Sequence, residues 1–182
     1  RPGLLTNQSN IIIQGSLDEN SDMIKIAGTR VLQNADKTFS GEVSLTDQGV
    51  NIFRVEALDG SNNNQIINLP VIYDSVAPIL SNASPSGSNI VYQKTGDVEI
   101  SIEGNEALQV LAANSEAMAV SNNAQRQFTG ILSFISSGQK NLEFRATDLA
   151  GNVGVVSTQF DLVIDNVAPV LAFDPALPNL TN

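Results

Sequence analysis

The pentapeptide Asp74-Ser75-Val76-Ala77-Pro78 returns 91 positions later (74 to 165) as Asp165-Asn166-Val167-Ala168-Pro169. Each copy follows an apolar run typical of a strand, and new apolar residues follow each copy. Proline fixes its own φ and pushes the residue before it into an extended conformation. We therefore expect each pentapeptide to be a stiff, extended joint that follows one copy of a repeated module.

Most of the two halves match at a slightly shorter spacing of 89 positions (11 to 100). Asp59 matches Asp148 at this spacing, whereas the joints match at 91. We therefore place two additional residues of the second copy in the loop after Asp148, where changes of length are tolerated. The longest matched stretches are Ile11–Gly15 with Ile100–Gly104, and Phe39–Leu45 with Phe128–Phe134.

Within each copy the apolar residues recur at every second position, as in Phe53, Val55 and Ala57. This alternation is typical of half-buried strands, and short strands separated by polar turns predict a β-sandwich. Pro70 lies in the last predicted strand, which must then be an edge strand or carry a bulge. The strands predicted in the first copy are Leu4–Thr6, Asn10–Ser16, Met23–Ala27, Arg30–Gln33, Thr38–Leu45, Val50–Leu58 and Gln65–Tyr73.

One segment of the second copy, Asn105–Ser121, is rich in Ala and is compatible with an amphipathic helix. Register with the first copy instead predicts a strand, a turn near Ala113-Asn114-Ser115, and a second strand. We favour the strands, because the 89-residue spacing holds on both sides of the segment.

Composition excludes several classes of function. The net charge of −10 disfavours nucleic acids and anionic membranes as partners. With no Cys and no His, the chain cannot form disulfides, thiolate zinc sites or a Ser-His-Asp triad. No apolar run approaches the ~18–20 residues of a membrane span. Glu99, Glu103 and Glu106 are close in sequence, but no sugar-stacking Trp accompanies them, so we predict no catalytic residues and no enzyme activity.

An ordered set of short motifs carries a family resemblance. In the first copy Ile24-x-Ile26-x-Gly28 is followed by Phe39-x-Gly41 and Ala57-x-Asp59, and the second copy contains Ala146–Asn152 (ATDLAGN). Together they resemble the bacterial immunoglobulin-like (Big) domains that occur as tandem repeats in surface and adhesin-type proteins. The joints are similar to the Asp-Thr-Thr-Ala-Pro joints of those arrays. The first copy departs from the pattern at Asp59–Asn63 (DGSNN), which leaves the conformation of that loop open.

The resemblance implies an all-β fold with two tandem immunoglobulin-like β-sandwich domains arranged end to end. We expect domain 1 at residues 1–76, domain 2 at residues 77–167, and the start of a further repeat or a linker at residues 168–182. A joint of about five residues spans at most ~17 Å, too little for one domain to fold back on the other.

The resemblance also implies the function: a non-catalytic stalk or spacer and interaction module of a bacterial cell-surface or secreted repeat protein. Its partners would be neighbouring repeats and a host or surface protein or glycan, and its location would be extracellular. One alternative is an adhesive module that binds a ligand through loops such as Asp59–Asn64 or Ser81–Asn89. Another is an accessory domain of an exported hydrolase.

The joint suggests one candidate metal site. Asp74 should lie near the loops that carry Asn105-Glu106, Asn122-Asn123 and Asp148, and oxygen ligands from several loops suit Ca²⁺. The candidate ligands of this interdomain calcium are Asp74, Glu106 and Asp148; no other cofactor is expected. The alternative is that Asp74, Asp148 and Asp165 only accept hydrogen bonds from nearby turns. The equivalent acidic end of domain 1 would carry Asp18, Glu19, Asp22, Asp36 and Asp59.

Overall fold

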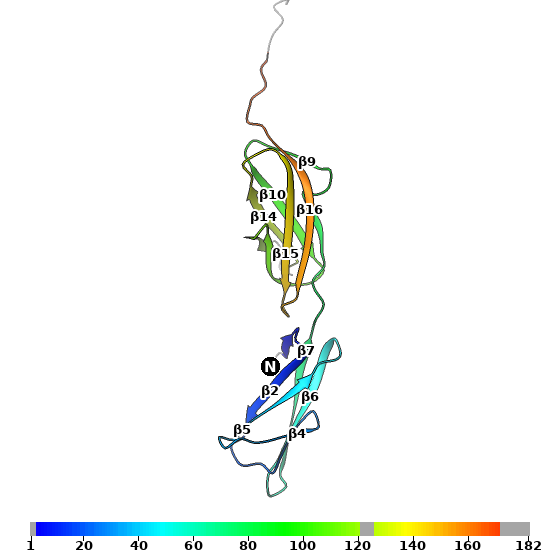
Figure 1. The fold of residues 1–182 in the computed structure, drawn as a ribbon, viewed down its shortest axis with the longest axis vertical. Coiled ribbons are helices and arrows are strands. Elements are labelled where there is room, and N and C mark those ends of the chain that lie inside the picture. The colour runs from blue at the N-terminus through cyan, green and yellow to red at the C-terminus, as the bar shows by residue number, and fades with distance from the viewer. Residues whose placement is uncertain (1–2, 121–125, 172–182) are drawn as a thin grey trace, which may run out of the picture.

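A computed structural model describes residues 3–120 and 126–171. It is all-β, and the chain forms two immunoglobulin-like sandwiches that stand end to end (Figure 1). The segment from Asp74 to Ile79 leads from one sandwich into the other. The predicted fold class is confirmed.

The first sandwich packs a five-stranded sheet, in the order β1-β7-β6-β3-β4, against a two-stranded sheet of β2 and β5. β1 runs parallel to β7, and the other pairs are antiparallel. The strands are β1 (Leu4–Thr6), β2 (Asn10–Ser16), β3 (Met23–Ile26), β4 (Thr29–Val31), β5 (Thr38–Ser44), β6 (Gly49–Leu58) and β7 (Asn64–Tyr73).

The second sandwich packs a five-stranded sheet, β12-β11-β15-β16-β9, against a four-stranded sheet, β13-β14-β10-β8. β10 is therefore paired on both sides, with β14 and with β8, whereas its counterpart β2 pairs only with β5 among the described residues. The strands are β8 (Leu80–Ser84), β9 (Ile90–Gln93), β10 (Asp97–Gly104), β11 (Leu108–Ala113), β12 (Glu116–Ala117), β13 (Ala119–Val120), β14 (Gln127–Ser133), β15 (Gly138–Asp148) and β16 (Val153–Ile164).

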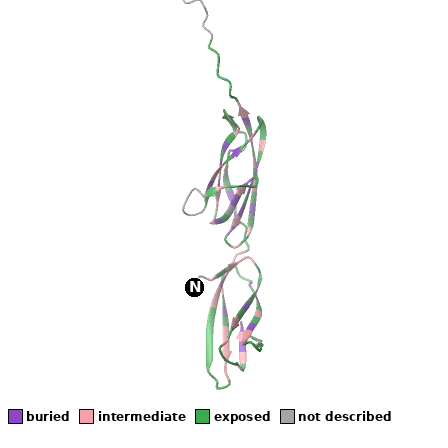
Figure 2. Ribbon diagram, turned by 90° about the vertical axis from the view of Figure 1, so that its left-hand side faces the viewer, coloured by how far each residue is buried: buried purple, intermediate pink, exposed green. Residues whose placement is uncertain are grey.

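Alternation along the strands builds a separate core in each sandwich. Figure 2 shows buried and exposed residues alternating along the ribbons of both domains. Every second residue of β10 is buried, namely Val98, Ile100 and Ile102, and β15 buries Leu142 and Phe144 in the same way. The first core contains Ile13, Ile24, Ile26, Phe39, Val43, Leu45, Phe53 and Val71.

The strands predicted for the first copy are confirmed to within about two residues at each end. In Asn105–Ser121 the strands are also confirmed and the helix is excluded, since β11, β12 and β13 occupy the segment. Asn114 and Ser115 turn the chain between β11 and β12 with φ values of 48° and 73°. Two consecutive positive φ values suit the right-handed twist of a tight hairpin.

Among the described residues, Pro70 has a paired strand on one side only, as expected for a proline at an edge position. It pairs with Ile52 of β6 on one side, and β1 begins its pairing on the other side only at Val71. The missing N–H of Pro70 therefore interrupts no ladder that the described residues form.

The placement of the two additional residues was wrong. Gly49 pairs with Tyr73 and Gly138 pairs with Leu162, so the 89-residue spacing holds through the whole final hairpin of each domain. The extra residues are Val163 and Ile164, which extend β16 just before the second joint. The loops after Asp59 and Asp148 have equal lengths, because β7 begins at Asn64 and β16 at Val153.

The strand directions decide which loops meet at the junction. β7 ends at the junction, so the Asp59–Asn63 loop that precedes it lies at the opposite, far end of the first domain (Figure 1). In the second domain the corresponding loop, between β15 and β16, lies at the junction. The same end of the module thus faces the joint in one domain and solvent in the other.

Candidate cation site at the junction

Asp74 begins the joint directly after β7. Its N–H donates to the carbonyl of Thr6 (2.9 Å), which continues the pairing of β1 with β7. Its Oδ1 accepts the N–H of Val76 (3.0 Å), so the side chain also fixes the turn toward Pro78. This is the turn-capping role considered from the sequence, and it leaves Oδ2 available.

Asp148 ends β15 and is the one buried charged residue in the described part of the chain, with 1% of its surface exposed. Its Oδ1 accepts the backbone N–H groups of Ala150, Gly151 and Asn152 at 2.7 to 2.9 Å. Its Oδ2 accepts the side-chain amide of Asn152 (2.9 Å). The carboxylate therefore organises the β15–β16 loop, and these hydrogen bonds compensate for its burial.

Asn152 connects this loop to the preceding domain. Its Nδ2 donates both to Asp148 and to the carbonyl of Asp74 (2.8 Å). A second link is reciprocal: the N–H of Ile79 donates to Asn105 Oδ1 (2.8 Å), and the N–H of Asn105 donates to the carbonyl of Ile79 (3.0 Å). Hydrogen bonds therefore fix the joint segment to the second domain at both of its ends, Asp74 and Ile79.

Glu106 lies between β10 and β11 and is half-buried beside the other two acids. Burial raises the pKa of its carboxyl above the ordinary value, the negative charges of Asp148 and Asp74 raise this pKa further, and Arg126 opposes the shift. The surroundings of Glu106 therefore disfavour the charged form of its carboxyl group.

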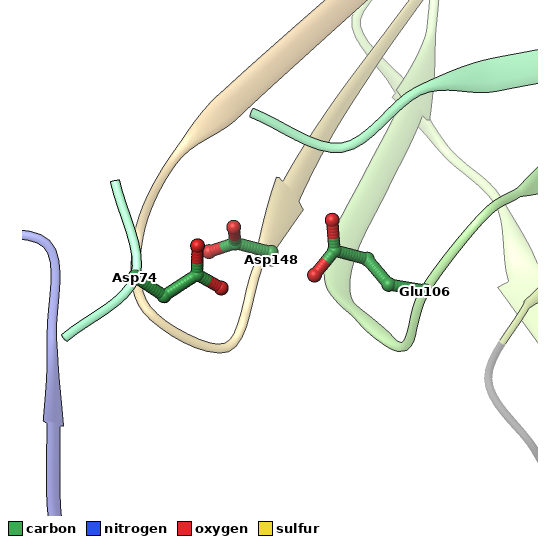
Figure 3. A group of neighbouring side chains, drawn as sticks. All are labelled: Asp74, Glu106 and Asp148. Carbon is green, nitrogen blue, oxygen red and sulfur yellow. The ribbon is translucent and has the colours of Figure 1, made fainter. Parts of the chain in front are cut away.

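The three predicted ligands come together. Carboxylate oxygens of Asp74, Glu106 and Asp148 lie within 4.8 Å of one another, and Figure 3 shows the three groups directed toward a common region with Asp148 in the middle. Three carboxylates from three separate segments offer hard oxygen ligands to a divalent cation. Asn105 uses its side-chain oxygen on Ile79, and Asn122-Asn123 lie outside the described residues.

Two of the acids expected at the far end of domain 1, Asp36 and Asp59, accept hydrogen bonds from residues two to four positions further along the chain. Asp59 repeats the role of Asp148: its Oδ1 accepts the N–H groups of Ser61 and Asn63, and its Oδ2 accepts the Asn63 amide (2.7 Å). Hydrogen bonds from Asn63 hold the pKa of Asp59 below its usual value. Within residues 3–120 and 126–171, no second group of three acids meets as those at the junction do.

Glu103 lies on β10, between β8 and β14. It accepts hydrogen bonds from Asn82 and Gln127, both at 2.7 Å, and these bonds lower its pKa, with that from Asn82 the larger cause. Because Asn82 lies on β8 and Gln127 on β14, Glu103 connects both of these strands to β10. The role of Glu103 is therefore to hold neighbouring strands together.

Comparison with known proteins supports the fold. No protein-family model matches the chain, and a sequence search found no match among curated proteins. The fibronectin(III)-like modules of Clostridium thermocellum CbhA are similar in structure, with a TM-score of 0.53 and 9% identity over 95% of this chain and 97% of theirs. At this identity the likeness concerns the fold: the chain has the architecture of tandem immunoglobulin-like and fibronectin III-like modules.

Other solved structures give weaker matches. Extracellular domains 3–5 of Drosophila OTK match with a TM-score of 0.31 at 12% identity, over 86% of this chain and 52% of theirs. The Bacteroides ovatus protein SGBP-B, from a mixed-linkage glucan utilization locus and solved with a mixed-linkage heptasaccharide, matches with a TM-score of 0.27 at 16% identity, over 88% of this chain and 43% of its own. The described residues contain no helix suited in length and apolarity to crossing a membrane.

Proposed function

We propose that the chain is a non-catalytic spacer and interaction module of an extracellular repeat protein of the bacterial immunoglobulin-like type. The observation that carries the proposal is the docked joint: hydrogen bonds from Asn152 to Asp74, and between Asn105 and Ile79, fix one sandwich on the end of the other. With a joint held in this way, each additional module increases the length of the protein.

The proposal divides the chain into modules at residues 1–76 and 77–167, with residues 168–182 beginning a further repeat or a linker. The separate cores support this division, since the first draws on residues up to Tyr73 and the second on residues from Leu80 onward. The acidic charge of −10 keeps such rods soluble and apart. Neighbouring modules are its proposed structural partners, and a bacterial cell surface or the medium around it is the proposed location.

Small-angle X-ray scattering tests the spacer role. β16 has 12 residues, which corresponds to ~40 Å at a rise of about 3.3 Å per residue, so two domains in line should contribute at least ~80 Å to the longest dimension of the particle. We expect a rod-shaped particle at all salt concentrations. A compact particle, or one whose length depends on ionic strength, would contradict a docked joint.

An adhesive role remains the second candidate, and exposed aromatic surface is the feature that favours it. Tyr92 on β9 is 71% exposed, and carbohydrate ligands commonly stack on such rings. Binding of a glycan or a matrix protein by the wild-type chain, lost in the variant Tyr92→Ala, would support this role. A role as an accessory domain of a hydrolase would be tested by sequencing the gene on both sides of this chain.

We further propose that the junction acids bind a calcium ion that stiffens the joint. The three carboxylates lie close enough to repel one another, and the pKa of Glu106 is raised. A bound divalent cation would neutralise this repulsion. Calcium added to millimolar concentration should raise the melting temperature of wild-type protein and perturb the amide signals of Asp74 and Glu106. The matched control Asp97→Asn removes an acid far from the junction and should respond as wild type, while Glu106→Gln should lose the response. An unchanged melting temperature in wild-type protein would reject the calcium site.

A further inference from the structure

The joint is also held from the side of the first domain. Ser75 follows Asp74 and lies beside the loop between β5 and β6, at residues 45–48. The side chain of Gln48 makes two hydrogen bonds to Ser75. Its Oε1 accepts the N–H of Ser75 (3.2 Å), and its Nε2 donates to the Oγ of Ser75. Because both ends of the amide bond one residue, Gln48 fixes the direction of the chain at Ser75 as well as its distance.

The β5–β6 loop does not depend on Gln48 for its own shape. Gly49 turns the chain into β6 with a φ of 90°, a conformation that favours glycine. Asn51 Nδ2 donates to the carbonyls of Asp47 (2.8 Å) and Gly49 (3.1 Å), and these bonds close the loop. Both polar atoms of the Gln48 side chain go to Ser75 instead.

The sheet order places a contact on each side of the joint. β7, which leads into the joint, lies between β1 and β6. Gln48 directly precedes β6 and therefore holds the joint on the β6 side. On the β1 side, Asn7 follows β1 and contacts the β15–β16 loop, since a Cβ built on Gly151 would lie 3.5 Å from Asn7 Nδ2. The two contacts oppose a swing of the second domain toward either edge of the sheet.

The second domain holds the same short segment from its own side. Asn152 donates to the carbonyl of Asp74, and Asn105 exchanges two hydrogen bonds with the backbone of Ile79. Loss of Gln48 would therefore leave the joint attached to the second domain and loosen it from the first. Loss of Asn152 would loosen it from the second domain instead. The two substitutions place the movement on different sides of the joint.

The contact made by Gln48 belongs to this junction and not to the repeated fold. Ser137 is its counterpart, because it directly precedes Gly138 as Gln48 precedes Gly49. Ser137 Oγ accepts the N–H of Ile164 (2.9 Å), which lies within β16. The second copy thus uses the same position to hold its own strand, and only the first copy uses it to hold a joint.

We propose that Gln48 is a positioning residue that sets the orientation of the first domain relative to the joint and the second domain. The inference rests on the proposed spacer role and adds the residue of the first domain that makes the joint rigid. Gln48 and Ser75 are exposed, so each hydrogen bond between them contributes modestly. Without both bonds, the ratio of fixed to loose orientations should fall on the order of fivefold or more.

Residual dipolar couplings of the backbone amides, measured in a weakly aligning medium, test this role. In wild-type protein we expect the couplings of both domains and of the joint to fit one common alignment. In Gln48→Ala the first domain should follow its own alignment, while the amides of Val76 and Ile79 still fit the second domain. In Asn152→Ala the amide of Val76 should instead follow the first domain.

Three further variants make the test specific. Gln48→Glu should restore the common alignment, because a carboxylate accepts both the N–H and the hydroxyl of Ser75. Gln139→Ala removes an exposed glutamine from β15 and is the matched control, which should behave as wild type. The double variant of Gln48→Ala and Asn152→Ala should be looser than either single variant, because the two bonds lie on opposite sides of the joint.

The outcomes separate this inference from the spacer role. One common alignment in Gln48→Ala, together with a double variant no looser than Asn152→Ala, would overturn the role of Gln48 and leave the docked joint intact. Equal loosening by Gln139→Ala would also overturn it. Separate alignments of the two domains in wild-type protein would contradict the docked joint itself, and the role of Gln48 with it.

Discussion

The two domains share one fold but differ in how completely they are closed. The second domain has β8 along β10 and a docked joint at its end, and its central residues Leu142 and Phe128 are 0% and 2% exposed. Their counterparts in the first domain, Phe53 and Phe39, are each 8% exposed. In the second domain the segment that follows the joint contributes Leu80 to the core, so it takes part in the packing of that domain as well as in the connection.

The largest expected effect on stability comes from truncating Phe39 and Phe128, which occupy equivalent positions in the two cores. Phe128→Ala should destabilise the second domain by about 3–5 kcal/mol, and Phe39→Ala should destabilise the first domain by less, because its ring is already more exposed. Calorimetry should show one transition shifted and the other retained in each variant. Loss of both transitions together would mean that the two cores do not fold independently.

A smaller difference in stability should distinguish substitution of Asn152 from substitution of its counterpart Asn63. Asn152→Ala removes hydrogen bonds to Asp148 and Asp74 and should lower stability by about 1–3 kcal/mol. Asn63→Ala removes the bond to the exposed Asp59 carboxylate and should have a smaller effect. Urea denaturation measures both changes. Equal losses would show that the bond to Asp74 adds nothing to the second domain.

The smallest effect concerns the pH dependence of the junction. The pKa of Glu106 is raised in the folded state, so the folded protein binds more protons than the unfolded chain and loses stability as the pH rises through this range. Glu106→Gln should remove this loss, and the variant should be the more stable protein at neutral pH without calcium. Melting temperatures measured from pH 4 to pH 7 should diverge as the pH increases. Parallel curves would contradict the like-charge cluster.

Much of the fold was accessible from the sequence because the alternation of Phe53, Val55 and Ala57 marks strands directly. The proximity of Asp74, Glu106 and Asp148 followed from the end of the sandwich at which each loop must lie. The calcium ion itself stays a prediction. The conformation of the Asp59 loop, left open by its departure from the family pattern, proves to repeat that of the Asp148 loop.

Two features escaped the sequence analysis for physical reasons. Asn152 connects the domains, but in a chain rich in Asn its role depends on the carbonyl it meets in space; its only signal was an Asn four residues after an Asp in both copies. The two additional residues were misplaced because the matching motifs on either side show only that an insertion lies between them. They do not show at which position it lies. Only the pairing of Gly138 with Leu162 shows that they extend β16.

The central claim is that the joint holds the two domains in one orientation, and a distance distribution across it is the most direct test. Because the chain has no Cys, the substitutions Ser40→Cys on β5 and Ile131→Cys on β14 provide the two thiols for spin labels, with no other thiol in the chain. Pulsed electron spin resonance should give one narrow distance distribution, which broadens when Asn152→Ala is added. A broad distribution in the doubly labelled protein that Asn152→Ala leaves unchanged would contradict a docked joint.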